Sequence, residues 1–182
     1  VVVPPLLYAA FLGIQEASER QWLGRAPTHD AIDVRLQQPH TVALLDVGFD
    51  SLATRLKLIE QAKTSIELEF FIYEVDTASR LVTQALARKA REGVKVRLLV
   101  DFSLPVFKLA PHYAHELADA GVEVRYYNTA GLARFFAVNH RTHRKLLVVD
   151  RARAIIGGRN IGDDYFDLSE RYNFLDSDLL IQ

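Results

Sequence analysis

Two stretches of sequence decide the fold: HRKLLVVD at residues 143–150 and, six residues further along, GGRN at residues 157–160. The continuous apolar run from Leu146 to Val149 predicts a central strand, beginning at His143, that is covered on both faces of its sheet. Side chains two positions apart on a strand project to the same side. His143 and Lys145 are therefore expected to point at one spot.

The side chains that this pattern gathers suit an attack on phosphorus. An imidazole with an ordinary pKa of about 6.5 can be a neutral nucleophile, and His143 would then form a covalent phosphohistidine. Lys145 supplies a cation, and Asn160 supplies amide donors, to the phosphate oxygens as charge builds on them. Gly158, in the glycine pair, lets the backbone turn tightly and come close to the phosphate, which brings Asn160 round beside the strand.

Asp150 ends the predicted strand, and its side chain is expected to point to the opposite side from that of His143. We count it among the site residues in a supporting role, as a structural partner that bonds backbone or a neighbouring cation and does not contact phosphate. Taken singly, a histidine at a strand start or a glycine pair at a turn is more often structural than catalytic. The combination at these spacings is what favours a site.

Apolar runs and amphipathic stretches alternate from Thr41 onward, which is typical of an α/β domain. Strands are expected at residues 41–45, 65–73, 94–100 and 122–127, and helices at residues 52–62, 78–92 and 112–120. Asp50 and Ser51 are expected to cap the first helix, and Gly93 and Gly121 to end the other two.

The composition excludes some classes of function. The chain has 182 residues, 49% of them hydrophobic, which is enough for one domain whose core needs no metal or disulfide. A net charge of −1 does not indicate a general nucleic-acid-binding chain, and the absence of cysteine excludes thiol chemistry. Basic residues nevertheless gather at 134–159 and acidic ones at 163–178. This distribution favours an anion site, although a solvated basic loop followed by an acidic one would also produce it.

The first forty residues form a separate segment. No methionine occurs anywhere, so the chain is expected to be a processed or excised piece. Residues 1–14 are uncharged and apolar but are too few to span a bilayer as a helix. Residues 1–40 are therefore expected to form an N-terminal arm, which either packs on the core or is the remnant of a signal or membrane anchor.

A metal site is a competing interpretation of the histidines. His140 and His143, like His112 and His115, are three residues apart in the sequence. No further clustered ligand accompanies either pair, so neither a metal nor another cofactor is predicted.

The spacing H-x-K, four residues, D, six residues, G-G-x-N resembles the HKD motif of the phospholipase D superfamily. The longer stretch at residues 157–166 is similar to bacterial cardiolipin synthases of the phospholipase D type, and the likeness extends from about Leu45 to the end. The resemblance implies a mixed β-sheet flanked by helices on both faces over residues 41–182. It also implies phosphatidyl transfer through a covalent phosphohistidine, an anionic phospholipid substrate and a membrane-associated bacterial protein. Asp176, in Asp176-Ser177-Asp178, matches the carboxylate that orients the nucleophilic imidazole.

Two departures from the family pattern stand out. Arg144 takes the place of the asparagine usual in cardiolipin synthases, which leaves the acceptor alcohol open. The family builds its site from two HKD motifs and this sequence has one, so the second is expected from a C-terminal half or from a homodimer. A phospholipase D or nuclease phosphodiesterase with nucleic acid as partner, a non-catalytic binding or assembly lobe, and a metal-dependent hydrolase remain as alternatives.

Overall fold

The computed structural model describes residues 39–102, 109–127 and 141–182, together with residues 10, 13, 14 and 17. The chain divides into two units, one of residues 1–39 with 128–141 and the other of residues 40–127 with 142–182. Every helix and strand named below belongs to the second unit. The predicted N-terminal arm lies, apart from a few positions, outside the described residues.

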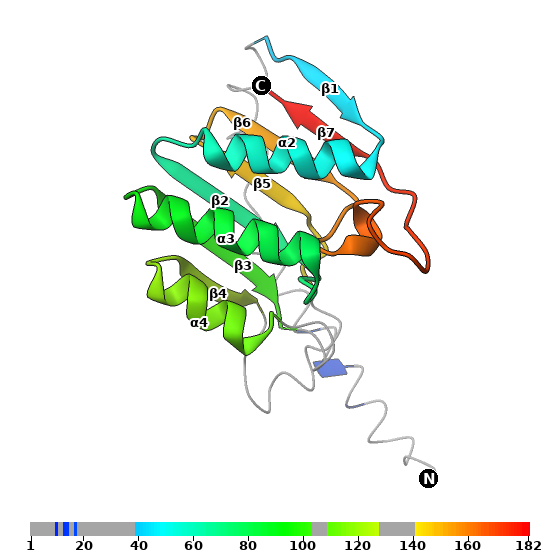
Figure 1. Ribbon diagram of the computed structural model, residues 1–182. Coiled ribbons are helices and arrows are strands. Elements are labelled where there is room, and N and C mark those ends of the chain that lie inside the picture. Colours follow the sequence, from blue (N-terminus) through cyan, green and yellow to red (C-terminus); the bar gives the residue numbers. More distant parts are fainter. Residues whose placement is uncertain (1–9, 11–12, 15–16, 18–38, 103–108, 128–140) are drawn as a thin grey trace. The chain divides into compact units, whose positions relative to one another are not determined.

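In the described part of the chain seven strands form one sheet, in the order β1-β7-β6-β5-β2-β3-β4 (Figure 1). The strands are β1 Val42–Leu45, β2 Ser65–Phe70, β3 Lys95–Asp101, β4 Glu123–Tyr127, β5 Leu146–Val149, β6 Arg153–Gly157 and β7 Asp178–Ile181. Strands β2, β3 and β4 run parallel, whereas the other neighbouring pairs are antiparallel. The predicted mixed sheet is thus confirmed, with the two motif strands β5 and β6 near its centre.

Three helices form one layer over the sheet (Figure 1): α2 Gly48–Glu60, α3 Thr77–Arg91 and α4 Pro111–Asp119. Gly93 and Gly121 follow α3 and α4 with φ angles of 91° and 92°, in the left-handed region that glycine adopts without strain. They end these helices as predicted. Helices were expected on both faces of the sheet, but in the described residues they cover one face.

The strand register explains the difference between the two faces. Alternate residues such as Ile66, Leu68 and Leu147 lie under the helices and are almost fully buried, because they form the hydrophobic core. On the opposite face Leu44, Leu179 and Ile156 form a cross-strand row and are 60%, 40% and 43% exposed. This second face is apolar on β1, β7, β6 and β5.

Helix α2 begins earlier than the sequence pattern predicts. Its first residue is Gly48, whose amide donates to the Asp167 carboxylate at 2.7 Å, and its N-cap position Val47 makes no side-chain capping bond. The prediction that Asp50 and Ser51 cap this helix is therefore wrong. Ser51 is instead buried and bonds Asp178, which comes from a strand 127 residues away. None of the helices in the described ranges is long and apolar enough to span a bilayer.

Candidate active site

His143 and Lys145 lie at the start of β5, against the ring of Phe71. The imidazole of His143 is 5.0 Å from that ring, measured between ring centroids, and Lys145 Nζ is 5.6 Å from its centroid. The regular strand begins at Leu146, later than predicted, although Gly157 N still donates to the Lys145 carbonyl at 3.3 Å. His143 is exposed and Lys145 is buried, so solvent reaches the nucleophile candidate more freely than the cation.

The surroundings of His143 favour its neutral form. Although His143 is exposed, partial desolvation of its ring and the charge of Lys145 lower the pKa of His143, while Asp101 opposes them and raises it. Burial also lowers the pKa of Lys145, against an opposing effect of Asp176. Lys145 Nζ donates to the His143 carbonyl at 2.8 Å, which holds the two residues together. The site thus combines an imidazole whose neutral form is favoured with a partly desolvated cation, a combination suited to attack on an anionic phosphodiester.

Asn160 is held at the end of β2 by its own amide oxygen. Its Oδ1 accepts from Ile72 N at 3.0 Å, and the next residue, Ile161, pairs with Tyr73 in an isolated bridge. Because the oxygen is occupied by the backbone, the amide nitrogen is the donor of this side chain, and a hydrogen bond with the Tyr165 side chain already engages part of it. Ile72 directly follows Phe71, so the end of β2 brings Asn160 to the residues that flank His143 and Lys145.

The glycine pair allows Asp176 and Asp178 to lie close to the backbone of residues 157–158. A Cβ on Gly157 would lie 2.1 Å from Asp178 Oδ1, and one on Gly158 would lie 2.2 Å from Asp176 Oδ1. Neither glycine has a positive φ, so backbone conformation does not demand glycine here. Gly158 N donates to the Ser177 carbonyl at 3.1 Å. The two glycines therefore leave room for Asp176 and Asp178, while the predicted approach of the Gly158 backbone to phosphate stays a prediction.

Asp176 lies beside Gly158 and acts electrostatically on Lys145, whose pKa it raises. Its assignment as the carboxylate that orients His143 stays a prediction. Asp101, which the sequence pattern marked only as a strand end, is the acid that acts on His143. It is fully buried and accepts from Thr142 N at 2.9 Å, which fixes the segment leading into His143. Its place at the carboxyl end of a parallel strand was the available signal.

Asp150 lies at the other end of β5 and binds the backbone of the turn before β2. Its carboxylate accepts from the amides of Lys63, Thr64 and Ser65 at 2.7–3.1 Å and from the Thr64 hydroxyl at 2.9 Å. Asp150 itself has a φ of 54°, a left-handed conformation that aspartate tolerates better than most residues. These bonds give it a structural role at a distance from phosphate chemistry.

In the part of the chain that the structure describes, no further metal ligands accompany the histidine pairs considered as metal ligands. Within the described ranges, no group of three or more histidine, aspartate or glutamate side chains could hold a metal ion. His112 and His115 lie on α4, and His140 lies outside the described residues.

A domain family described as cardiolipin synthase, PLD-like domain, matches residues 56–179, well over half of the chain. The chain belongs to this phospholipase D-like family. Cardiolipin synthase A of Pseudomonas putida is 43% identical over 125 residues, covering 68% of this chain and 26% of that protein. The major cardiolipin synthase ClsA of Bacillus subtilis is 33% identical over 138 residues, covering 75% and 28%. The phospholipase D-like chain thus spans less than a third of the length of these curated relatives.

Two solved structures have a fold similar to that of this chain. NucT from Helicobacter pylori superposes with a TM-score of 0.58 at 14% identity, covering 79% of this chain and 86% of that one. Nuc from Salmonella typhimurium, a phospholipase D family member, gives 0.53 at 16% identity, covering 79% and 82%. At such identities the likeness concerns the fold alone, and it confirms the fold that the resemblance implied.

Proposed function

We propose that this chain carries one half of a phosphatidyltransferase site of the cardiolipin synthase type. The observation that supports it most directly is that His143 and Lys145 lie against the ring of Phe71, while Asn160 binds the amide of the next residue, Ile72. An anionic phospholipid at a membrane surface would place its phosphate beside His143. The similarity to the cardiolipin synthases of P. putida and B. subtilis supports a lipid over other phosphodiesters.

The reaction takes two steps of similar geometry. First, the neutral imidazole of His143 forms a bond to phosphorus, the bond from phosphorus to the glycerol oxygen breaks, and that oxygen takes up a proton. Glycerol leaves and the phosphatidyl group stays on His143. A hydroxyl of a second phosphatidyl-bearing alcohol then loses its proton and attacks phosphorus, and the P–N bond breaks. Lys145 and Asn160 stabilise the charge on the non-bridging oxygens in both steps.

The first step needs a general acid for the leaving oxygen. One imidazole cannot stand on both sides of an in-line displacement, so His143 does not serve as both nucleophile and acid. The proposal therefore includes a second motif-bearing lobe, either in a longer chain or in a second copy related by a twofold axis. In isolation, the chain is then inactive toward phosphatidylglycerol or active on it only as a dimer.

The test separates the need for a nucleophile from the need for a general acid by the choice of leaving group. The p-nitrophenyl ester of phosphatidic acid releases a phenolate that needs no protonation, so His143 alone suffices for its first turnover. We expect a burst of p-nitrophenolate and a base-stable label that maps to His143. The burst disappears in His143→Ala and persists in His115→Ala, a matched change at an exposed histidine on α4. Phosphatidylglycerol turnover, followed together with light scattering, then reports whether a dimer is required.

Other outcomes contradict the proposal in different ways. Turnover of an oligonucleotide with no reaction of either lipid would identify a nuclease that uses the same histidine. Binding of tungstate without any burst would identify a binding or assembly lobe. Loss of the burst in EDTA would identify a metal-dependent hydrolase.

A further inference from the structure

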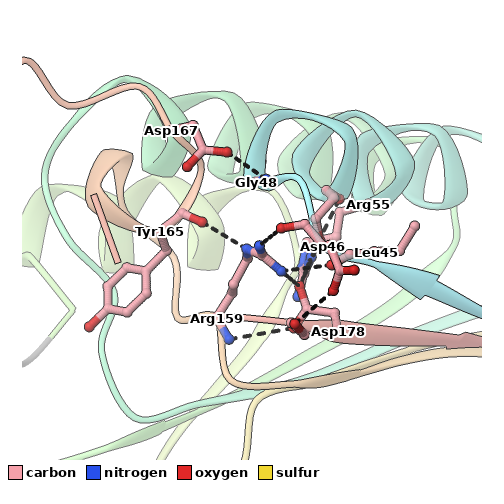
Figure 2. A network of polar contacts seen from close by, with 10 residues as sticks. Leu45, Asp46, Gly48, Arg55, Arg159, Tyr165, Asp167 and Asp178 are labelled. Carbon is pink, nitrogen blue, oxygen red and sulfur yellow. Dashed lines mark hydrogen bonds and ion pairs between the residues drawn. The ribbon is translucent and has the colours of Figure 1, made fainter. Parts of the chain in front are cut away.

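A buried group of charges (Figure 2) includes Arg159, the residue that precedes Asn160 in the chain. Asp178 Oδ2 accepts from Ser51 Oγ at 2.7 Å, from Arg55 Nη1 at 3.1 Å and from Arg159 Nη1 at 3.1 Å. All four residues are at most 3% exposed. We call Arg55, Arg159 and Asp178 the charge cluster.

Arg159 connects the charge cluster to three backbone carbonyls in two separate parts of the chain. Its Nε donates to the Tyr165 carbonyl at 3.0 Å, its Nη1 donates to the Leu45 carbonyl at 2.8 Å, and its Nη2 donates to the Asp46 carbonyl. Figure 2 shows the guanidinium enclosed by these partners. A planar group that makes this many bonds fixes its own backbone, and that backbone lies between Gly158 and Asn160.

Asp178 connects the same cluster to the other side of the site. Its Oδ1 accepts from Arg159 N at 3.4 Å and packs against Gly157, with which it is in register between β6 and β7. Asp178 is two residues after Asp176. Asn160 and Asp176 therefore each lie within two residues of a member of the charge cluster.

Stability alone gives a weak reason for such an arrangement. Two guanidiniums share one carboxylate, and Arg55 Nε has no hydrogen-bond partner within the described part of the chain, although the Arg55 guanidinium lies 5.3 Å from the Phe166 ring centroid. Removing charges from water carries a penalty that apolar packing avoids. What the cluster supplies and apolar packing does not is a fixed direction for each bond, and hence a fixed backbone on both sides of the site.

We propose that Arg55, Arg159 and Asp178 are positioning residues that hold Asn160 and Asp176 in register beside His143, without touching the substrate. The catalytic consequence rests on the proposed function, whereas the positioning itself does not. Arg55 holds Asp178 from α2, Asp178 holds the start of β7, and Arg159 holds the turn that carries Asn160.

The first experiment measures positioning without any substrate. Asp178→Asn keeps the size of the side chain but removes its charge, and Leu58→Ala truncates a buried α2 side chain that lies outside the cluster. In Asp178→Asn we expect the side-chain amide signals of Asn160 to broaden or split in NMR spectra. We also expect hydrogen exchange at Gly158 and Asn160 to speed up by about tenfold or more, as for a local opening. Leu58→Ala is expected to leave the Asn160 signals unchanged when the two variants are compared at the same loss of Tm.

The second experiment uses the p-nitrophenyl burst. Asp178→Asn is expected to lower the burst rate about a hundredfold with little change in the concentration for half-saturation, because a misplaced group acts mainly on the transition state. In an Asn160→Ala background the same change is expected to slow the burst by a smaller factor than in the unaltered chain, because the part of the effect that passes through Asn160 is already lost. Unchanged Asn160 signals in Asp178→Asn would overturn the positioning role. The same changes of the Asn160 signals and of the burst rate in Leu58→Ala as in Asp178→Asn would also overturn it. If the unaltered chain gives no burst, the proposed function fails, and the NMR comparison still decides the inference.

Discussion

The carboxylate of Asp176 occupies the space that a side chain on Gly158 would need, because a Cβ there would lie 2.2 Å from Asp176 Oδ1. Asp176 Oδ1 is a side-chain atom, so an added methyl on residue 158 displaces the carboxylate and not the backbone. The position of the Asp176 carboxylate therefore depends on residue 158 being a glycine.

Gly158→Ala is therefore expected to push Asp176 away from Lys145 and to slow the p-nitrophenyl burst by about ten- to a hundredfold. The free energy of unfolding should fall by about 1–3 kcal/mol, as for other insertions into a packed region. Gly13→Ala is the matched control, since a Cβ on Gly13 meets nothing within 4 Å. A full burst rate in Gly158→Ala would show that Asp176 has no part in the reaction.

A second prediction concerns the titration of His143. Burial and Lys145 lower its pKa, so its ring is expected to titrate below the ordinary value of about 6.5. Since only the neutral imidazole is a nucleophile, activity should persist to a lower pH than an ordinary histidine allows and fall as pH drops through the lowered pKa.

Two substitutions should move this pKa in opposite directions. Lys145→Gln removes a neighbouring cation and is expected to raise the pKa of His143, whereas Asp101→Asn removes an opposing acid and is expected to lower it further. NMR titration of the His143 ring in the unaltered chain and in each variant measures both shifts. Shifts in the same direction would mean that a structural change, and not charge, controls the pKa.

The third prediction links Asp150 to stability at acid pH. Burial raises the pKa of Asp150, but hydrogen bonds from Thr64, Ser65 and Lys63 outweigh it and lower the pKa from 3.8 to about 2. A carboxylate whose pKa is depressed in the folded state stabilises the fold above its unfolded pKa, and the stabilisation disappears as pH falls through the folded value. The contribution should therefore be complete above about pH 4 and lost towards about pH 2.

Asp150→Asn tests this linkage. Because the side chain is 18% exposed, solvent screening reduces the effect, and we expect a loss of about 1–2 kcal/mol in the free energy of unfolding at pH 7. Urea titrations of both proteins at pH 7 and at about pH 2 should show the difference shrinking toward zero at the lower pH. A difference independent of pH would assign the loss to packing.

Much of this site was readable from the sequence because strand periodicity is local. The spacing of His143 and Lys145 predicted that both would contact one region, and both contact Phe71. The strand expected at residues 65–73 likewise contains β2, Ser65–Phe70. Gly93 and Gly121 marked helix ends because the left-handed conformation is a property of single residues.

The remainder was not readable because it depends on contacts between distant segments. Nothing near Arg159 in the sequence indicates that its guanidinium binds the carbonyls of Leu45 and Asp46, more than a hundred residues earlier. The start of α2 at Gly48 depends in the same way on Asp167. Asp101 reaches His143 only because β3 and β5 lie on either side of β2.

The last prediction concerns the energy stored in the charge cluster. Asp178→Ala leaves the guanidiniums of Arg55 and Arg159 buried without the carboxylate that they share. Removing one partner from a buried ion pair typically costs about 3–5 kcal/mol, because the remaining charge is uncompensated, and we expect a loss in that range. Adding Arg55→Met removes one of the two unpaired cations and should recover part of the loss. Urea unfolding of the two single variants and the double variant gives the coupling free energy. A double variant whose loss equals the sum of the single losses would mean that Arg55 and Asp178 stabilise the fold independently, despite the 3.1 Å contact between them.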